Sequence, residues 1–163
     1  MSHNSKRTTQ WRHHLKAEFG YRDLTDDVAE LVTRSGVTDG IVVVPVTGST
    51  GAITTIEFEP GALKDLRDAL ERIAPIGEHY AHNARWGDGN GFSHVRSALL
   101  KTSLSVPVVD GKLVLGTWQQ IVVLNLDNRE REREVVAVLP DPVQLHASNM
   151  GEARQEPRGP PAG

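Results

Sequence analysis

The sequence predicts an α+β domain built on a mostly antiparallel sheet with packed helices. Apolar, β-branched runs recur along the chain, and segments with the apolar spacing of helices lie among them. The last third of the chain holds only strand-like runs after one short helix. Mixed strands and helices followed by a late run of strands are typical of α+β domains. The length of 163 residues suits one such domain with its own core.

A strand and a helix are the first elements that the sequence predicts. Polar and apolar residues alternate over 8–19, which favours a half-buried strand. Thr25 is followed by two aspartates, so its hydroxyl is expected to cap free N–H groups at the start of a helix. Gly36 is expected to end that helix as its C-terminal glycine.

Two strands and a second helix are expected next. The β-branched runs 41–46 and 52–58 are expected to form strands around the small residues of the Thr47–Gly51 turn. Pro60 fits the first turn of a helix, and apolar residues recur at helical spacing over 63–73. This helix is expected to pack on the sheet.

The rest of the chain predicts one short helix and a strand meander. A loop through His79 and His82 is expected to lead to a helix near 92–100, with Val95, Leu99 and Leu100 as its buried side. Strands are then expected at Ser103–Val109, at Lys112–Thr117 continuing into Gln119–Leu126, and at Glu134–Leu139, with a hairpin turn at Asp110-Gly111.

Composition excludes several classes of protein. The domain is expected to span 8–143, between unstructured tails 1–7 and 147–163 that hold almost nothing to bury. The chain has no cysteine, which excludes disulfides, thiolate metal ligands and a cysteine nucleophile. The first residues are polar and no apolar run approaches the roughly 20 residues of a membrane span, so we expect a cytoplasmic protein with no membrane partner. The net charge of −3 argues against a nucleic-acid partner.

The segment Trp86–Arg96 gathers an acid, an amide, a hydroxyl, an imidazole and a guanidinium around three alternating glycines. Glycine loses more backbone freedom on folding than any other residue, so this alternation suggests a loop that turns sharply or approaches a ligand closely. Ser93 stands where a helix could begin, and the free N–H groups of a helix start can bind phosphate or carboxylate. The segment therefore predicts an anion-binding active-site loop.

Three residues in and just before this loop, His82, Asp88 and His94, are ligand types that a zinc-like or manganese-like ion accepts. No helical spacing of the metalloprotease kind fixes their geometry. The alternative interpretation is that both histidines hydrogen-bond loop carbonyls and that Asp88 caps a turn. Four further histidines are expected to be solvated, namely His3, His13, His14 and His146.

Three more segments carry polar groups that could reach a ligand. The Thr47–Gly51 turn resembles a phosphate-binding nest but lacks the lysine and the following helix of a P-loop, so a plain hairpin turn is the alternative. Gln119 lies between apolar segments, and its amide is either locked in a core network or directed at a ligand. Alternating arginines and glutamates over 129–134 are expected to be solvated and paired with one another, with one arginine in reach of an anion.

Several of these motifs carry a family resemblance. Over residues 11–139 the chain resembles the YjbQ family, through the segments Gly89–Leu100, Thr102–Val109 and Leu115–Ile121 in that order. The resemblance implies a YjbQ-like α+β sandwich that assembles as a homotrimer. It also implies thiamine-phosphate synthase activity, a transferase reaction that joins a hydroxymethylpyrimidine diphosphate to a thiazole phosphate and releases pyrophosphate.

Many members of that family carry His-Thr-Thr or His-Thr-Ser where this chain has Gly48 and the two residues after it, so the chain resembles a variant subgroup. In the synthase interpretation His82 or His94 moves a proton and Asp88 orients it. Glu57 and Asp88 would hold Mg²⁺ or another divalent metal. The expected phosphate ligands are Ser49, Thr50, Asn90, Ser93, Arg96 and Gln119. Two other functions stay open: non-catalytic binding of a small phosphorylated metabolite, and a His/carboxylate metal-dependent hydrolase.

Overall fold

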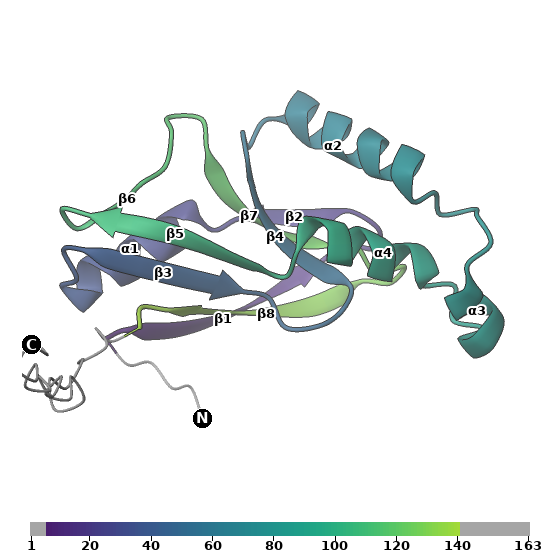
Figure 1. Ribbon diagram of the computed structural model, residues 1–163, viewed down its shortest axis with the longest axis horizontal. Helices are drawn as coiled ribbons and strands as arrows, with labels where there is room; N and C mark the ends of the chain where they lie inside the picture. The colour runs from purple at the N-terminus through teal and green to yellow at the C-terminus, as the bar shows by residue number, and fades with distance from the viewer. Residues whose placement is uncertain (1–5, 141–163) are drawn as a thin grey trace, which may run out of the picture.

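The computed structural model describes residues 6–140, which fold into two antiparallel sheets and four helices (Figure 1). The predicted α+β class is therefore confirmed. The predicted tails lie almost wholly outside the described residues, as does the expected domain end at 143. The strands are β1 (Thr8–Leu15), β2 (Gly20–Asp23), β3 (Gly40–Pro45), β4 (Gly51–Ile56), β5 (Ser103–Val109), β6 (Lys112–Leu113), β7 (Gln120–Asn125) and β8 (Arg131–Val138). The helices are α1 (Thr25–Ser35), α2 (Pro60–Ile73), α3 (Ala81–Trp86) and α4 (Gly91–Leu100).

The two sheets have the strand orders β1-β8-β3-β5-β6 and β2-β7-β4. In the first sheet, β1 pairs with β8 along its whole length, from Thr8 opposite Val138 to Leu15 opposite Arg131. The strand predicted over 8–19 is in fact two strands, because the chain turns after Leu15 and β2 joins the other sheet beside β7.

The plain hairpin turn that was the alternative interpretation of Thr47–Gly51 is wrong. β3 pairs with β5 and β8, whereas β4 pairs with β7 in the other sheet. The turn therefore crosses from one sheet to the other and does not close a hairpin. The Val46 N–H donates to the Thr102 carbonyl at 2.8 Å, and the Thr47 N–H donates to the Glu134 carbonyl at 2.9 Å. These two hydrogen bonds hold the start of the crossing on the five-stranded sheet.

The predicted late meander is confirmed only at its first turn. Asp110 and Gly111 have φ angles of 49° and 71°, which suit a two-residue hairpin turn, and they join β5 to β6. β6 ends at Leu113, so the strand expected to continue to Thr117 is much shorter. β7 pairs with β2 and β4, and β8 pairs with β1 and β3.

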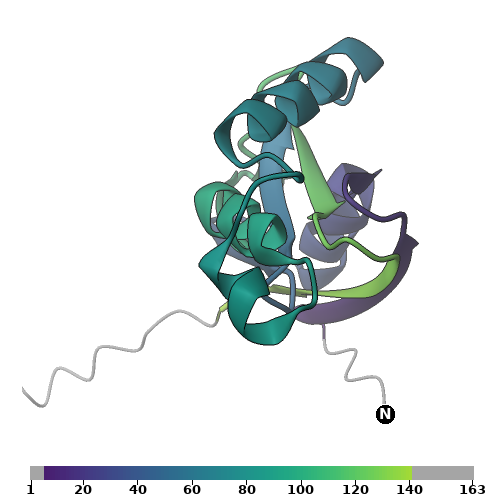
Figure 2. The same ribbon diagram turned by 90° about the vertical axis from the view of Figure 1, so that its right-hand side faces the viewer.

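Side chains alternate along β7 and build two cores. Ile121 and Val123 face a core that also contains α1 and the inner side of the five-stranded sheet. Val122 and Leu124 face a second core beneath α2. Figures 1 and 2 show α2 set apart from the larger sheet, over the strands of the smaller one. Because both faces of β7 are covered, its sequence is apolar at every position from Ile121 to Leu124 and shows no polar alternation.

Helix α1 begins at Thr25, but the Thr25 hydroxyl does not cap it. That hydroxyl donates to Asp23 Oδ1 at 2.6 Å and accepts the Ile121 N–H at 2.9 Å, so it joins the helix start to both neighbouring strands. Gly36 ends the helix with a φ of 72°, as predicted. None of the helices within residues 6–140 is long and apolar enough to cross a membrane.

Helix α2 confirms the element expected from Pro60, but α4 buries a different face from the predicted one. Val95 and Leu99 are 40% and 53% exposed. The buried residues of α4 lie on the side that faces β4, and they are Gly91, Phe92, Ser93, Arg96 and Ser97. The Ser97 hydroxyl donates to the Gly51 carbonyl at 2.6 Å and fixes α4 to the first residue of β4. A short helix, α3, takes the place of the loop expected around His82.

Candidate metal centre

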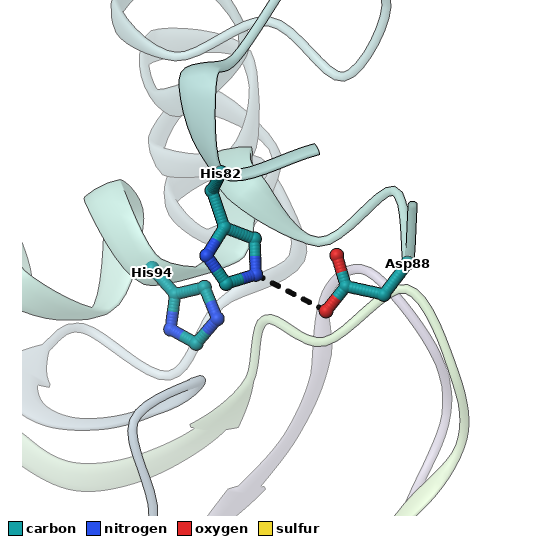
Figure 3. A group of neighbouring side chains, drawn as sticks. All are labelled: His82, Asp88 and His94. Atoms are coloured by element: carbon teal, nitrogen blue, oxygen red, sulfur yellow. Dashed lines mark hydrogen bonds and ion pairs between the residues drawn. The ribbon is translucent and has the colours of Figure 1, made fainter. Parts of the chain in front are cut away.

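His82, Asp88 and His94 lie together on the surface and point toward one another (Figure 3). His82 is in α3, His94 is in α4, and Asp88 is in the glycine-rich loop between these helices. One ligand atom from each side chain lies within 4.8 Å of the other two. The imidazole rings of His82 and His94 are 4.5 Å apart between centroids. The grouping predicted from the sequence is therefore present in the structure.

His94 is oriented by the turn that crosses between the sheets. Its Nδ1 lies 3.2 Å from the Ser49 carbonyl oxygen, which can only accept a hydrogen bond. The Nδ1 atom must therefore carry the proton, and the lone pair of Nε2 is free. A carbonyl that fixes the tautomer in this way is the usual support of a metal-binding histidine.

His82 and Asp88 form a hydrogen-bonded pair. The His82 Nε2 atom lies 3.1 Å from Asp88 Oδ2, and the other carboxylate oxygen, Oδ1, accepts the Asn90 N–H at 3.1 Å. The hydrogen bond from His82 is the main reason that the pKa of Asp88 lies below its usual value. Asp88 thus also caps a turn, and His94 also binds a loop carbonyl, as the alternative interpretation predicted. Neither contact uses the Nε2 lone pair of His94.

The glycines of the loop allow backbone conformations and close contacts that a side chain would prevent. Gly87 and Gly89 have φ angles of 67° and 68°, in the left-handed region that favours glycine. Gly91 begins α4 where a Cβ atom would lie 2.6 Å from Tyr80 Cγ. The Gly91 N–H donates to Asn83 Oδ1 at 2.8 Å. These contacts bring α3 and α4 close enough for their two histidines to meet.

We expect Gly91→Ala to lower the free energy of unfolding by about 1–3 kcal/mol, because its methyl group must push Tyr80 away. A Cβ at Gly77 would have no atom within 4 Å, so Gly77→Ala is the matched control. Urea denaturation of both variants measures the difference. Equal midpoints for the two variants would contradict the close approach of the two helices.

A buried polar network supports the Ser49 side of the site. Arg133 is only 5% exposed, and its Nη2 donates to the Thr50 carbonyl at 2.9 Å and to the Thr50 hydroxyl at 2.7 Å. Its Nε donates to Asn125 Oδ1 at 3.0 Å. The Thr50 hydroxyl in turn donates to Asp127 Oδ2 at 2.9 Å. β8 and the end of β7 thereby hold the residue that follows Ser49.

Asp127 extends this network toward Asp88. Burial raises the pKa of Asp127, but hydrogen bonds from Arg131, Asn90 and Thr50 outweigh it, so the net shift is downward. Asn90 is buried, and its side-chain oxygen accepts the Asn128 N–H at 3.1 Å. The Asn128 amide donates to the Asp88 carbonyl at 2.8 Å. Both the His94 and the Asp88 sides of the cluster therefore rest on the same group of buried polar residues.

Four of the six expected phosphate ligands are buried. They make internal contacts, and they are Thr50, Asn90, Ser93 and Arg96. The Ser93 hydroxyl donates to the Asn90 side chain, so it is not at an open helix start. Arg96 pairs with Glu71, and its Nε donates to the Ala74 carbonyl at 3.0 Å, so it joins α4 to α2. A phosphate contact of any of these four stays a prediction, and their geometry shows a structural role.

The other predicted site residues lie at opposite ends of β4. Ser49 is exposed just before the strand, next to His94. Gln119 donates from Nε2 to the Thr55 hydroxyl at 3.1 Å near the strand's far end, and it accepts the Gly116 N–H at 3.0 Å. Glu57 follows the same far end. Within one chain the length of β4 separates Glu57 from Asp88, so the structure does not bring these two carboxylates together, and a metal role for Glu57 stays a prediction.

The sequence did not single out Arg133 among the arginines of 129–134, and it did not point to Asp127. The arginines over 129–134 were expected to be solvated, but β8 is a strand, so every second residue faces inward. Arg133 shares the inner face with Val135 and Ala137, which are fully buried. The period of two was the signal that could have found it. The polar residues that directly follow the apolar run of β7 were the corresponding signal for Asp127.

Comparison with known proteins identifies the family. Residues 9–141 match the family model described as UPF0047 protein YjbQ-like. A UPF0047 protein from Archaeoglobus fulgidus is 38% identical over 117 residues, which cover 72% of this chain and 89% of the relative. One from Methanothermobacter thermautotrophicus is 39% identical over 120 residues, covering 74% and 82%. The crystal structure of a hypothetical protein from Aeropyrum pernix matches with a TM-score of 0.75 and 29% identity, covering 83% of this chain and 98% of that one. Because the family model spans most of the chain and both relatives exceed 30% identity, this chain belongs to the YjbQ-like UPF0047 family.

Proposed function

We propose that His82, Asp88 and His94 bind a divalent ion of the zinc class and that the protein is a metal-dependent enzyme acting on a small phosphorylated molecule. The observation that carries this proposal is the approach of three ligand atoms to within 4.8 Å of one another. Two imidazoles and one carboxylate suit zinc or manganese better than Mg²⁺, which prefers oxygen ligands. Three protein ligands also leave a fourth position open, as in catalytic zinc sites.

The residues around the cluster fit such an ion. In a tetrahedral site with bonds of about 2.0–2.1 Å, the ligand atoms are separated by about 3.3 Å. The 3.1 Å between His82 Nε2 and Asp88 Oδ2 is close to that value, so an ion would take the place of the shared proton. The free Nε2 of His94 supplies the third ligand. A bound ion would supply Lewis acidity toward a phosphoryl oxygen or a water molecule.

The surroundings of the cluster favour hydrolysis of an accessible substrate. The side chains of His82 and Asp88 are 32% and 41% exposed, so water and a small substrate can both reach them. Asp88 stays ionised because its pKa is lowered by the hydrogen bond from His82. In the metal-free protein this pair is also a proton relay, with the imidazole as the group that gives or takes the proton.

The test is the zinc content and the hydrolytic activity of the purified protein. We expect about one zinc or manganese per chain by elemental analysis, and activity toward small phosphate esters that a chelator removes and zinc restores. Calorimetric titration alongside the turnover assay separates catalysis from binding. Metal-free protein with full activity would contradict the proposal, whereas ligand binding without turnover would support the non-catalytic alternative.

Thiamine-phosphate synthesis is the second candidate, because the His82–Asp88 pair that would move its proton is in hydrogen-bond contact. The same assay with a hydroxymethylpyrimidine diphosphate and a thiazole phosphate tests it. Formation of thiamine phosphate and pyrophosphate would favour this candidate over hydrolysis.

The homotrimer implied by the resemblance is likewise a proposal, and sedimentation velocity of the intact chain tests it.

A further inference from the structure

Arg133 has one guanidinium nitrogen that its network does not use. Its hydrogen bonds to Thr50 and Asn125 all involve Nε and Nη2. Within residues 6–140, Nη1 has no acceptor. The residue is otherwise buried, so this nitrogen belongs to a rigidly held guanidinium. Nη1 is not one of the fully buried polar atoms that lack a partner within residues 6–140, so water or a ligand can reach it and supply the acceptor.

The free nitrogen faces a gap left by Gly48. A Cβ atom built on Gly48 would lie 3.0 Å from Arg133 Nη1, with no other atom beyond its chain neighbours within 4 Å. Gly48 is exposed, so the gap is open to solvent. Its φ of 116° is one that residues with a side chain rarely adopt, which suits a position that must remain without a Cβ. A distance of 3.0 Å is also that of an N–H···O hydrogen bond.

The charges around the gap favour an anion. Arg131 and Arg133 both lie within ion-pair distance of Asp127, at 3.0 Å and 3.9 Å, so two cations share one carboxylate. The backbone N–H groups of Gly48 and Ser49 have no acceptor in the described part of the chain. Unpaired donors on one exposed turn beside an arginine suit an acceptor with several oxygens, and phosphate is such a group.

We propose that Arg133 Nη1, reached across Gly48, binds a phosphate group of the substrate beside the metal centre. The carbonyl oxygen of Ser49, the residue after Gly48, accepts the hydrogen bond from His94 Nδ1, so this phosphate contact and the metal cluster share one turn. The inference deepens the proposed function and rests on it only for the claim that the bound phosphate is part of the substrate.

The direct test uses the intact wild-type chain and inorganic phosphate. The guanidinium NMR signals of ¹⁵N-labelled arginine are followed during titration, and the Arg133 signals are identified from their loss in Arg133→Lys. We expect a saturable shift of the Arg133 signals, with smaller changes at exposed arginines, and no such shift with chloride at equal ionic strength. Arg133 signals that stay in place at high phosphate would overturn the inference.

A second variant blocks the gap and leaves the guanidinium in place. Gly48→Ala puts a methyl group where the phosphate oxygen is expected, so the affinity for phosphate should fall at least about tenfold, and zinc affinity should stay within about twofold. Gly77→Ala is again the matched control. Equal phosphate affinity in Gly48→Ala and wild type would overturn the inference. Should Gly48→Ala not fold, the NMR titration decides alone.

The two proposals fail separately. Zinc binding without any effect of phosphate on the Arg133 signals would support the metal centre and contradict the phosphate contact. A phosphate-induced shift of the Arg133 signals in a protein that binds no zinc would support the phosphate contact and contradict the metal centre.

Discussion

Replacing Arg133 by methionine is expected to lower the free energy of unfolding by about 3–5 kcal/mol. The guanidinium is buried, and its removal leaves the Thr50 carbonyl and the Asn125 side-chain oxygen without their main donors. It also takes one of the two cations away from Asp127. Methionine has a similar length but no donor, so the loss is one of hydrogen bonds and charge more than of packing.

Arg131→Met provides the matched control, because the Arg131 side chain is 46% exposed while it contacts the same carboxylate. Its expected cost is about 1 kcal/mol or less. Chemical denaturation of both variants gives the comparison. Equal destabilisation by the two substitutions would contradict the conclusion that the buried hydrogen bonds of Arg133 stabilise the Thr47–Gly51 turn.

His94→Ala is expected to weaken zinc binding at least about 100-fold, because it removes a direct ligand, and loss of a supporting residue alone typically costs 10–100-fold. The hydrogen bond to Ser49 is on an exposed part of the structure, so the fold should be retained. Zinc affinity is measured by competition with a chromophoric chelator, and folding is followed by circular dichroism.

His14→Ala is the control for this substitution. His14 is also an exposed histidine beside a carboxylate, 3.1 Å from Glu130, but it lies on β1 outside the cluster. Its loss should leave zinc affinity within about twofold of the wild-type value. Unchanged zinc affinity in His94→Ala, or an equal loss in both variants, would refute the assignment of the metal centre.

Local signals predicted the elements that depend on neighbouring residues. The hairpin turn at Asp110-Gly111 and the helix end at Gly36 were correct, because positive φ angles at these sites are set by the residues themselves. The prediction of helix α2 was correct, since the signals for its start and for its apolar face both lie in one short segment. Strand pairing was not predictable in the same way. Whether β4 pairs with β3 or with β7 depends on the burial of both faces of β7, which is a property of the whole sheet.

The candidate site was predicted in part for a similar reason. His82, Asp88 and His94 lie within a short stretch of chain, so their residue types alone suggested a common site. The buried face of α4 was predicted wrongly, because an apolar residue such as Leu99 was expected to be buried in preference to Arg96. Arg96 is buried because its guanidinium pairs with Glu71 in α2 and donates to the carbonyl of Ala74 at the end of that helix. Arg133 meets Thr50 across a large separation in sequence. No local pattern encodes such a tertiary contact.

The pairing of β1 with β8 has a consequence for the order of folding. The first strand of the sheet has its hydrogen-bonding partner in the last one, since Thr8 lies opposite Val138. During synthesis β1 therefore cannot pair, and its backbone groups stay bound to water, until β8 has left the ribosome. Contacts of such large sequence separation make folding slow. We expect nascent chains that stop before β8 to expose the edges of both β1 and β3, and so to depend on chaperones more than chains that include β8 do.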